Sequence, residues 1–127
     1  THGGVQHSRL ATERALHSAA VERIIPDLQR VVAGLRRNPP RIRWVSSLTG
    51  TWMPANEVAD SSYWAEQMRR PVRFASALDA AANAGMRAFL EVGPGQALAS
   101  SARQHFHRDQ RDVIVTTSLS GSGAAIS

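Results

Sequence analysis

The stretch Arg87-Ala88-Phe89-Leu90-Glu91-Val92-Gly93-Pro94-Gly95 decides the fold class of this chain. Its first six residues are rich in apolar side chains, which is typical of a β-strand, and the glycines and proline that follow predict a tight loop. A helix is expected over Gln96–Phe106 and a further strand over Asp112–Ser118. Because a helix separates the two strands, they should run parallel in one sheet.

Helical patterns precede this strand. Apolar residues recur at three- and four-residue spacings from Ser18 to Leu35, which predicts an amphipathic helix, and Pro26 within it predicts a kink or a restart. A short helix is expected over Tyr63–Met68, because Asp60-Ser61-Ser62 offers an N-cap and Arg69-Arg70-Pro71 a stop.

Another helix should follow from Val72 to Ala84, closed by Gly85 as its C-terminal cap. One face of this helix carries apolar side chains: Phe74, Leu78 and Ala81 or Ala82. Residues Arg43–Ser47 are expected to form a short strand, and residues 121–127 a flexible tail. The fold class that results is α/β, a largely parallel sheet with flanking helices.

The composition fits one soluble globular domain. A chain of 127 residues with 43% hydrophobic and 20% charged residues can bury a modest core but not two domains. The absence of cysteine excludes disulfides and thiolate metal sites. We find no membrane-spanning stretch and no leader pattern, so a cytoplasmic protein is expected.

The charge points to anionic partners. The formal net charge is +5, and all 15 basic residues are arginine, a side chain suited to bidentate contact with phosphates or carboxylates. No aromatic residues interleave with the arginine clusters as a stacking platform for bases would require, so nucleic acid is disfavoured.

His17 is the candidate catalytic residue. It lies where a strand-like run, Ser8–Thr12, gives way to a helical pattern, and a helix N-terminus favours the neutral imidazole that a general base needs. No G-x-S-x-G motif and no cysteine occur in these residues, so the nucleophile is missing. His105 and His107 have no third ligand near them in the sequence, and no metal site is expected.

Four ordered segments resemble the C-terminal part of the acyltransferase domain of modular polyketide synthases, related to malonyl-CoA:acyl-carrier-protein transacylases. Arg14-Ala15-Leu16-His17-Ser18 resembles the family's His-Ala-Phe-His-Ser signature, and Val45-Ser46-Ser47-Leu48-Thr49-Gly50 its Val-Ser-Asn-Val-Thr-Gly. The run from Tyr63 to Phe74 resembles its Tyr-Trp…Arg-x-Pro-Val-Arg-Phe block, and Leu90-Glu91-Val92-Gly93-Pro94-Gly95 is the same as its Leu-Glu-Val-Gly-Pro-Gly. The likeness extends from about Arg9 to Ser118.

This resemblance implies the C-terminal half of the α/β-hydrolase-like large subdomain. Residues 1–13 would end the small ferredoxin-like subdomain, residues 14–120 would belong to the large one, and 121–127 would be the tail. The family's Gly-His-Ser-x-Gly nucleophile lies upstream of the matched region. The chain is therefore expected to be an acyltransferase fragment that is inactive alone.

The resemblance also implies roles for individual residues. His17 would be the catalytic base and the Gln67 backbone carbonyl its orienting acceptor, while Leu16 and Arg14 would contact the substrate. Bulky Leu16 favours malonyl over methylmalonyl, and Arg14 stands where the malonyl pattern has histidine.

The same resemblance implies the partners. Acyl-CoA would be the substrate, and an acyl carrier protein bearing phosphopantetheine the acceptor, with no cofactor permanently bound. The N-terminal part of the acyltransferase and neighbouring synthase domains would be further partners, and self-association through exposed edges is expected.

A second reading follows from the charge alone. It is a non-catalytic, arginine-rich α/β module that binds an acidic carrier protein or coenzyme A electrostatically. Substituting His17 would then leave binding unchanged.

Overall fold

The computed structural model describes residues 15–119. The run Ser8–Thr12, Arg14, residues 1–13 and the tail 121–127 lie outside the described residues. The elements, in chain order, are η1 (Ala19–Ile24), α1 (Ile25–Ala33), η2 (Glu57–Ala59), α2 (Ser61–Arg69), α3 (Phe74–Asn83), β1 (Ala88–Glu91), α4 (Ala97–Arg108) and β2 (Ile114–Thr117).

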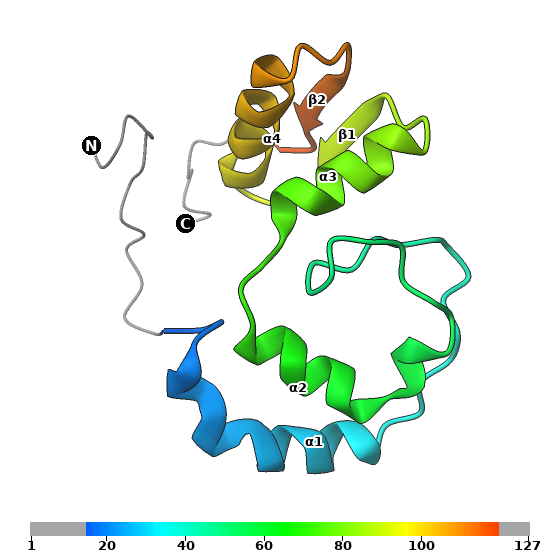
Figure 1. Ribbon diagram of the computed structural model, residues 1–127, viewed down its shortest axis with the longest axis vertical. Helices are drawn as coiled ribbons and strands as arrows, with labels where there is room; N and C mark the ends of the chain where they lie inside the picture. Colours follow the sequence, from blue (N-terminus) through cyan, green and yellow to red (C-terminus); the bar gives the residue numbers. More distant parts are fainter. Residues whose placement is uncertain (1–14, 120–127) are drawn as a thin grey trace, which may run out of the picture.

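These elements form two groups that a short link joins (Figure 1). In one group α1 lies alongside α2, with η1 and η2 at their ends. In the other group α3 and α4 pack with the two strands. The link is Arg70 to Arg73, which leaves the end of α2 and enters α3.

The sheet confirms the predicted parallel arrangement. β1 pairs with β2 in parallel register, from Ala88 opposite Ile114 to Glu91 opposite Thr117, with α4 as the crossover between them. The buried cluster beneath the sheet consists of Leu78, Ala82, Ala102 and Phe106, with Phe74, Phe89, Val113 and Val115 packed against it. Of the two alanines predicted to share a face with Leu78, Ala82 is the buried one.

One face of the sheet is open in the described part of the chain. Phe89 and Val115 point to the core, while Leu90 is 57% and Ile114 68% exposed. Parallel sheets normally carry cover on both faces, because their strands are apolar on both sides. The exposed face is therefore a surface on which another layer can pack.

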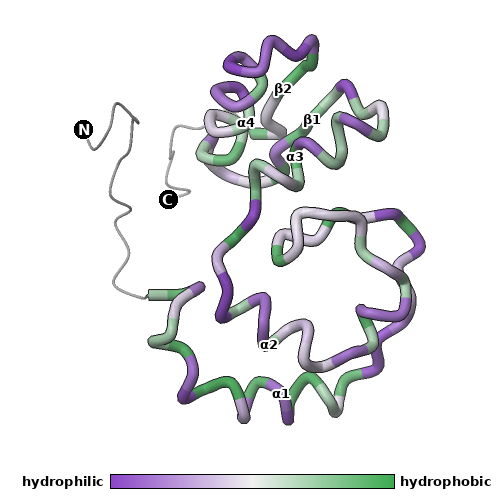
Figure 2. Tube along the Cα trace, in the orientation of Figure 1, coloured by the Kyte–Doolittle hydropathy of each residue, from purple (hydrophilic) through white to green (hydrophobic). Residues whose placement is uncertain are grey.

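Pro26 divides the first helical region as predicted. The chain forms η1 and then restarts as α1, with the proline in the first turn of α1. Proline is tolerated there because its missing amide donor would have no partner inside the helix. Figure 2 shows hydrophobic and hydrophilic residues alternating along α1, as expected of an amphipathic helix.

The predicted strand over Arg43–Ser47 is wrong. Val45 makes only an isolated antiparallel bridge with Trp52, and the segment folds back on itself. Ser46 closes this loop: its amide donates to the Thr51 carbonyl at 2.8 Å, and its buried hydroxyl lies 2.9 Å from the Tyr63 hydroxyl. Local contacts thus satisfy the backbone groups that a sheet would have used.

The start of α3 differs from the prediction. The helix expected from Val72 begins at Phe74, because Pro71 to Arg73 form the link.

Among the described residues no helix is long and apolar enough to span a bilayer.

Gly50 is a position where the loop requires glycine. Its φ is +74°, and a Cβ there would clash with the Ser76 Cβ on α3. We predict that Gly50→Ala lowers the free energy of unfolding by about 2–4 kcal/mol, from the left-handed backbone and the clash together.

Gly34→Ala is the matched control, because that glycine has a φ of −78° and no contact closer than 3.5 Å for a Cβ. This substitution should be neutral or stabilise by up to about 1 kcal/mol in urea unfolding. Equal effects of the two substitutions would contradict the close approach of the loop to α3.

The open sheet face predicts that the 127-residue chain self-associates. Leu90→Lys should shift sedimentation velocity profiles toward the monomer, because it places a charge on that face. Ile42→Lys, in a loop position that is 83% exposed and away from the sheet, should leave association unchanged. A wild-type chain that stays monomeric at high concentration would contradict self-association through the exposed face of the sheet.

Candidate active site

His17 has an unusual backbone conformation. Its φ is +59°, in the left-handed region that residues with a side chain seldom occupy. Its amide donates to the Met68 carbonyl at 2.9 Å, which fixes the residue against the end of α2. Such conformations persist when surrounding contacts hold them, and they gather at functional sites.

The ring of His17 is held by two carbonyls at the C-terminal end of α2. Nδ1 lies 3.0 Å from the Gln67 carbonyl oxygen and 3.1 Å from that of Arg70. Carbonyl oxygens only accept, so these partners assign the proton to Nδ1 and leave the lone pair on Nε2. The structure thus contains the contact between His17 and Gln67 that the resemblance implied; the catalytic role of the pair stays a prediction.

Pro71 explains why these carbonyls are free. Inside a helix the Gln67 carbonyl would accept from the amide four residues later, which is Pro71 and has no N–H. Arg70 is extended, with φ −86° and ψ 154°, so the helix cannot continue past it. The donors of His17 occupy the positions that the missing helical turn leaves vacant.

The electrostatic setting of His17 differs from the expected one. Ser18 does cap η1, since its hydroxyl accepts from the Ala20 amide at 3.2 Å. The His17 ring, however, contacts the C-terminal end of α2, where the helix carries partial negative charge. The ring therefore faces a helix C-terminus, and not the helix N-terminus that the sequence predicted.

Ion pairs join the elements around His17. Arg69 on α2 contacts Glu22 on η1 at 2.7 Å, and Arg70 contacts Glu66 at 2.6 Å. Exposed pairs of this kind each contribute little to stability, typically about 0–1 kcal/mol. The Glu22–Arg69 pair joins η1 to the last turn of α2, whereas the Glu66–Arg70 pair lies within the end of α2.

Asp60 caps the other end of α2. Its carboxylate accepts from the Ser62 amide at 2.8 Å, as the sequence predicted for an N-cap. Hydrogen bonds from the Ser62 amide and hydroxyl, with a smaller contribution from Arg37, lower the pKa of the Asp60 carboxyl below its usual value. The cap therefore stays charged at neutral pH and is lost only when acid protonates it.

Two hollows meet at the turn that holds the ring of His17. One, of about 700 Å³, lies between the η1–α1 region and α2, and the other, of about 540 Å³, lies toward the loop at Thr49. Glu66, Arg70 and Pro71 line both hollows. The same turn that holds the ring thus separates two spaces open to a ligand.

Of the two residues predicted to contact the substrate, the structure describes Leu16 only. Leu16 is 54% exposed next to His17, and Arg14 lies outside the described residues. The Gly93–Gly95 loop is shaped by Glu91, whose carboxylate accepts from the Leu98 and Ala99 amides at 3.3 and 2.8 Å. Sequence reasoning missed this capping role, although a carboxylate just before a helix is a recognisable signal.

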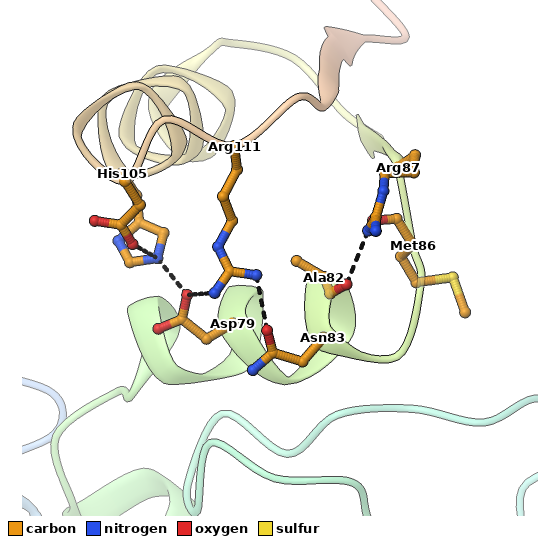
Figure 3. A network of polar contacts seen from close by, with 8 residues as sticks. Asp79, Ala82, Asn83, Met86, Arg87, His105 and Arg111 are labelled. Carbon is orange, nitrogen blue, oxygen red and sulfur yellow. Dashed lines mark hydrogen bonds and ion pairs between the residues drawn. The ribbon is translucent and has the colours of Figure 1, made fainter.

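The structure brings two carboxylates to His105 that the sequence analysis had not placed beside it. Its Nε2 lies 2.8 Å from Asp79 and 3.6 Å from Asp109, so two carboxylates are near it and could complete a metal site. Arg111 reaches Asp79 at 3.8 Å and donates to Asn83 at 2.8 Å (Figure 3). Because the Arg111 guanidinium already faces the Asp79 carboxylate, we interpret the cluster as a set of polar contacts that joins α3 to the end of α4.

In the described part of the chain, a histidine turns its Nδ1 to two main-chain carbonyls at a turn that lines two hollows, and general acid–base catalysis uses histidines oriented in this way. Comparison with known families agrees: residues 1–121 match the acyl transferase domain family. The chain belongs to this family.

Relatives and solved structures give the same result. The chain is 35% identical over 105 residues to a phenolphthiocerol/phthiocerol polyketide synthase protein from Mycobacterium tuberculosis (strain CDC 1551 / Oshkosh), covering 83% of this chain and 7% of the relative. It is 40% identical over 101 residues to polyketide synthase GfsA of Streptomyces halstedii, covering 80% of this chain and 1% of the relative.

Among solved structures, the acyl transferase domain of SpnD in complex with 2-(pent-4-yn-1-yl)malonyl matches with a TM-score of 0.79 and 30% identity, over 91% of this chain and 29% of that one. The acyltransferase domain from the second module of the salinomycin polyketide synthase matches with a TM-score of 0.74 and 31% identity, over 85% of this chain and 24% of that one. The chain is thus an α/β acyltransferase segment that spans under a tenth of the curated relatives and under a third of these solved domains.

Pro71→Ala tests why the carbonyls are available to His17. The new amide at position 71 can pair with the Gln67 carbonyl and extend α2, in competition with Nδ1. We predict a loss of transfer activity of about tenfold in the full-length protein, with little change in melting temperature. Pro54→Ala, in the loop before η2, is the control and should keep full activity; unchanged activity in both variants would contradict the explanation.

Proposed function

We propose that this chain supplies the catalytic base of an acyltransferase that moves a malonyl-type unit from coenzyme A to an acyl carrier protein. The observation that supports it is the contact of His17 Nδ1 with the Gln67 and Arg70 carbonyls, which leaves Nε2 free to accept a proton. The activity of the whole domain, its substrates and its carrier partner are part of this proposal.

The first half-reaction places the acyl group on the enzyme. Nε2 takes the proton of a serine hydroxyl, the serine oxygen bonds to the thioester carbonyl carbon, and the carbon–sulfur bond breaks. The departing thiolate of coenzyme A receives the proton back from the imidazolium. No G-x-S-x-G motif occurs in these residues, so the serine would come from another part of the domain.

The second half-reaction reverses the roles. His17 takes the proton from the phosphopantetheine thiol of the carrier protein, the thiolate attacks the acyl ester, and the serine oxygen recovers its proton. Two main-chain carbonyls take the place of the carboxylate of a Ser-His-Asp triad in holding the ring. Coenzyme A and phosphopantetheine act here as substrates, and the reaction as proposed uses no permanently bound cofactor.

Leu16 is the proposed specificity residue. Its bulky side chain precedes the base and crowds an α-substituent on the acyl group, which favours malonyl over methylmalonyl. The serine-dependent mechanism also implies that this chain alone forms no acyl adduct.

The decisive substitution is His17→Ala in the full-length protein. We predict a loss of acyl transfer of roughly 10²–10⁴-fold, because proton transfer to the serine and from the carrier thiol is removed. Transfer is measured as acyl-carrier formation by mass spectrometry, and circular dichroism checks that the variant is folded.

His107→Ala is the matched control, since that histidine is exposed on α4. Its activity should equal that of the wild type. Full transfer by the His17 variant would instead support a module that binds a carrier protein or coenzyme A without catalysis.

A further inference from the structure

The smaller of the two hollows at the turn of Arg70 and Pro71 carries an excess of positive charge. Its charged lining residues are Glu66, Arg70 and Arg73. Glu66 and Arg70 pair at 2.6 Å, so their charges offset each other. Arg73 forms no ion pair with any residue that the structure describes, and its side chain faces a space of about 540 Å³.

Arg73 is held in place by its backbone. Its amide donates to the Ser47 carbonyl at 2.7 Å, which ties the link between α2 and α3 to the loop at Ser47–Thr51. The close approach of Gly50 to Ser76 brings that loop against the start of α3. The backbone of Arg73 is therefore anchored, and Thr49 lines the same hollow.

The hollow adjoins the turn that holds the base. Arg70, whose carbonyl accepts from the His17 ring at 3.1 Å, also lines the hollow. Arg73 follows three residues later, a distance of at most about 10 Å along an extended chain. A ligand in this hollow that reaches His17 therefore passes the turn at Arg70 and Pro71 and comes within range of the Arg73 guanidinium.

We propose that Arg73 binds the phosphate of the phosphopantetheine arm, with the arm lying in this hollow and its thioester at His17. The inference rests on the proposed function and adds a binding site for one chemical group of its substrates. A guanidinium suits this ligand because its planar set of donors matches two phosphate oxygens. The same phosphate occurs in coenzyme A and on the carrier protein, so both substrates present it in turn.

Substrates with and without the phosphate test the proposal. In the full-length protein we compare malonyl-pantetheine, which has no phosphate, with malonyl-4′-phosphopantetheine and malonyl-CoA. Arg73→Gln should raise KM for the two phosphorylated donors by about tenfold or more and leave kcat unchanged, since a hydrogen bond to a charged group is lost. KM for malonyl-pantetheine should not change, and Arg73→Lys should recover part of the loss.

Arg108→Gln is the matched control for net charge, because Arg108 is an exposed arginine on α4. It should leave all three donors unaffected. A second series with the carrier protein as varied substrate separates the sources: a raised KM for the donor alone assigns the site to coenzyme A, and a raised KM for both donor and carrier assigns it to both substrates.

Two results would overturn the proposal. One is an equal effect of Arg73→Gln on phosphorylated and unphosphorylated donors, and the other is no effect on malonyl-4′-phosphopantetheine. Failure of the catalytic proposal gives a different signature, full activity of His17→Ala, which is independent of Arg73.

Discussion

The end of helix α2 is the constraint on which the site depends. Pro71 removes the amide that would have paired with the Gln67 carbonyl, and the extended Arg70 stops the helix. Two donors of His17, its backbone amide and its Nδ1, fill the places left open. The contact between His17 and the end of α2 therefore caps the helix, holds His17 in its left-handed conformation and sets the tautomer of this candidate base.

The packing around α2 keeps this end in position. Its N-terminus is capped by Asp60, while Tyr63 meets the buried Ser46 hydroxyl and stacks edge-on with Trp64 at 5.4 Å between ring centroids. Helix α1 lies alongside, and the Glu22–Arg69 pair joins η1 to the last turn. The site is thus carried on rigid secondary structure, which favours the accurate placement that proton transfer requires.

Patterns local in sequence predicted much of the fold. The parallel strands, the restart at Pro26 and the Asp60 cap each follow from a few adjacent residues. The Arg43–Ser47 strand failed because apolar alternation over so few residues cannot distinguish a sheet strand from a loop bridged to itself.

In the site, the family resemblance predicted the contact between His17 and the Gln67 carbonyl. No sequence pattern showed that the Arg70 carbonyl also contacts the His17 ring, or that the ring faces the C-terminal end of a helix. Those features, like the cluster of Asp79, His105 and Asp109, join segments far apart in the chain, and their positions depend on tertiary packing.

The tautomer of His17 tests the central claim most directly. In the folded protein labelled with ¹⁵N-histidine, the imidazole nitrogen shifts at neutral pH should show a proton on Nδ1 and a lone pair on Nε2. Pro71→Ala should weaken that preference as the Gln67 carbonyl gains another donor. A wild-type ring protonated at Nε2, or one exchanging freely between both tautomers, would contradict the account.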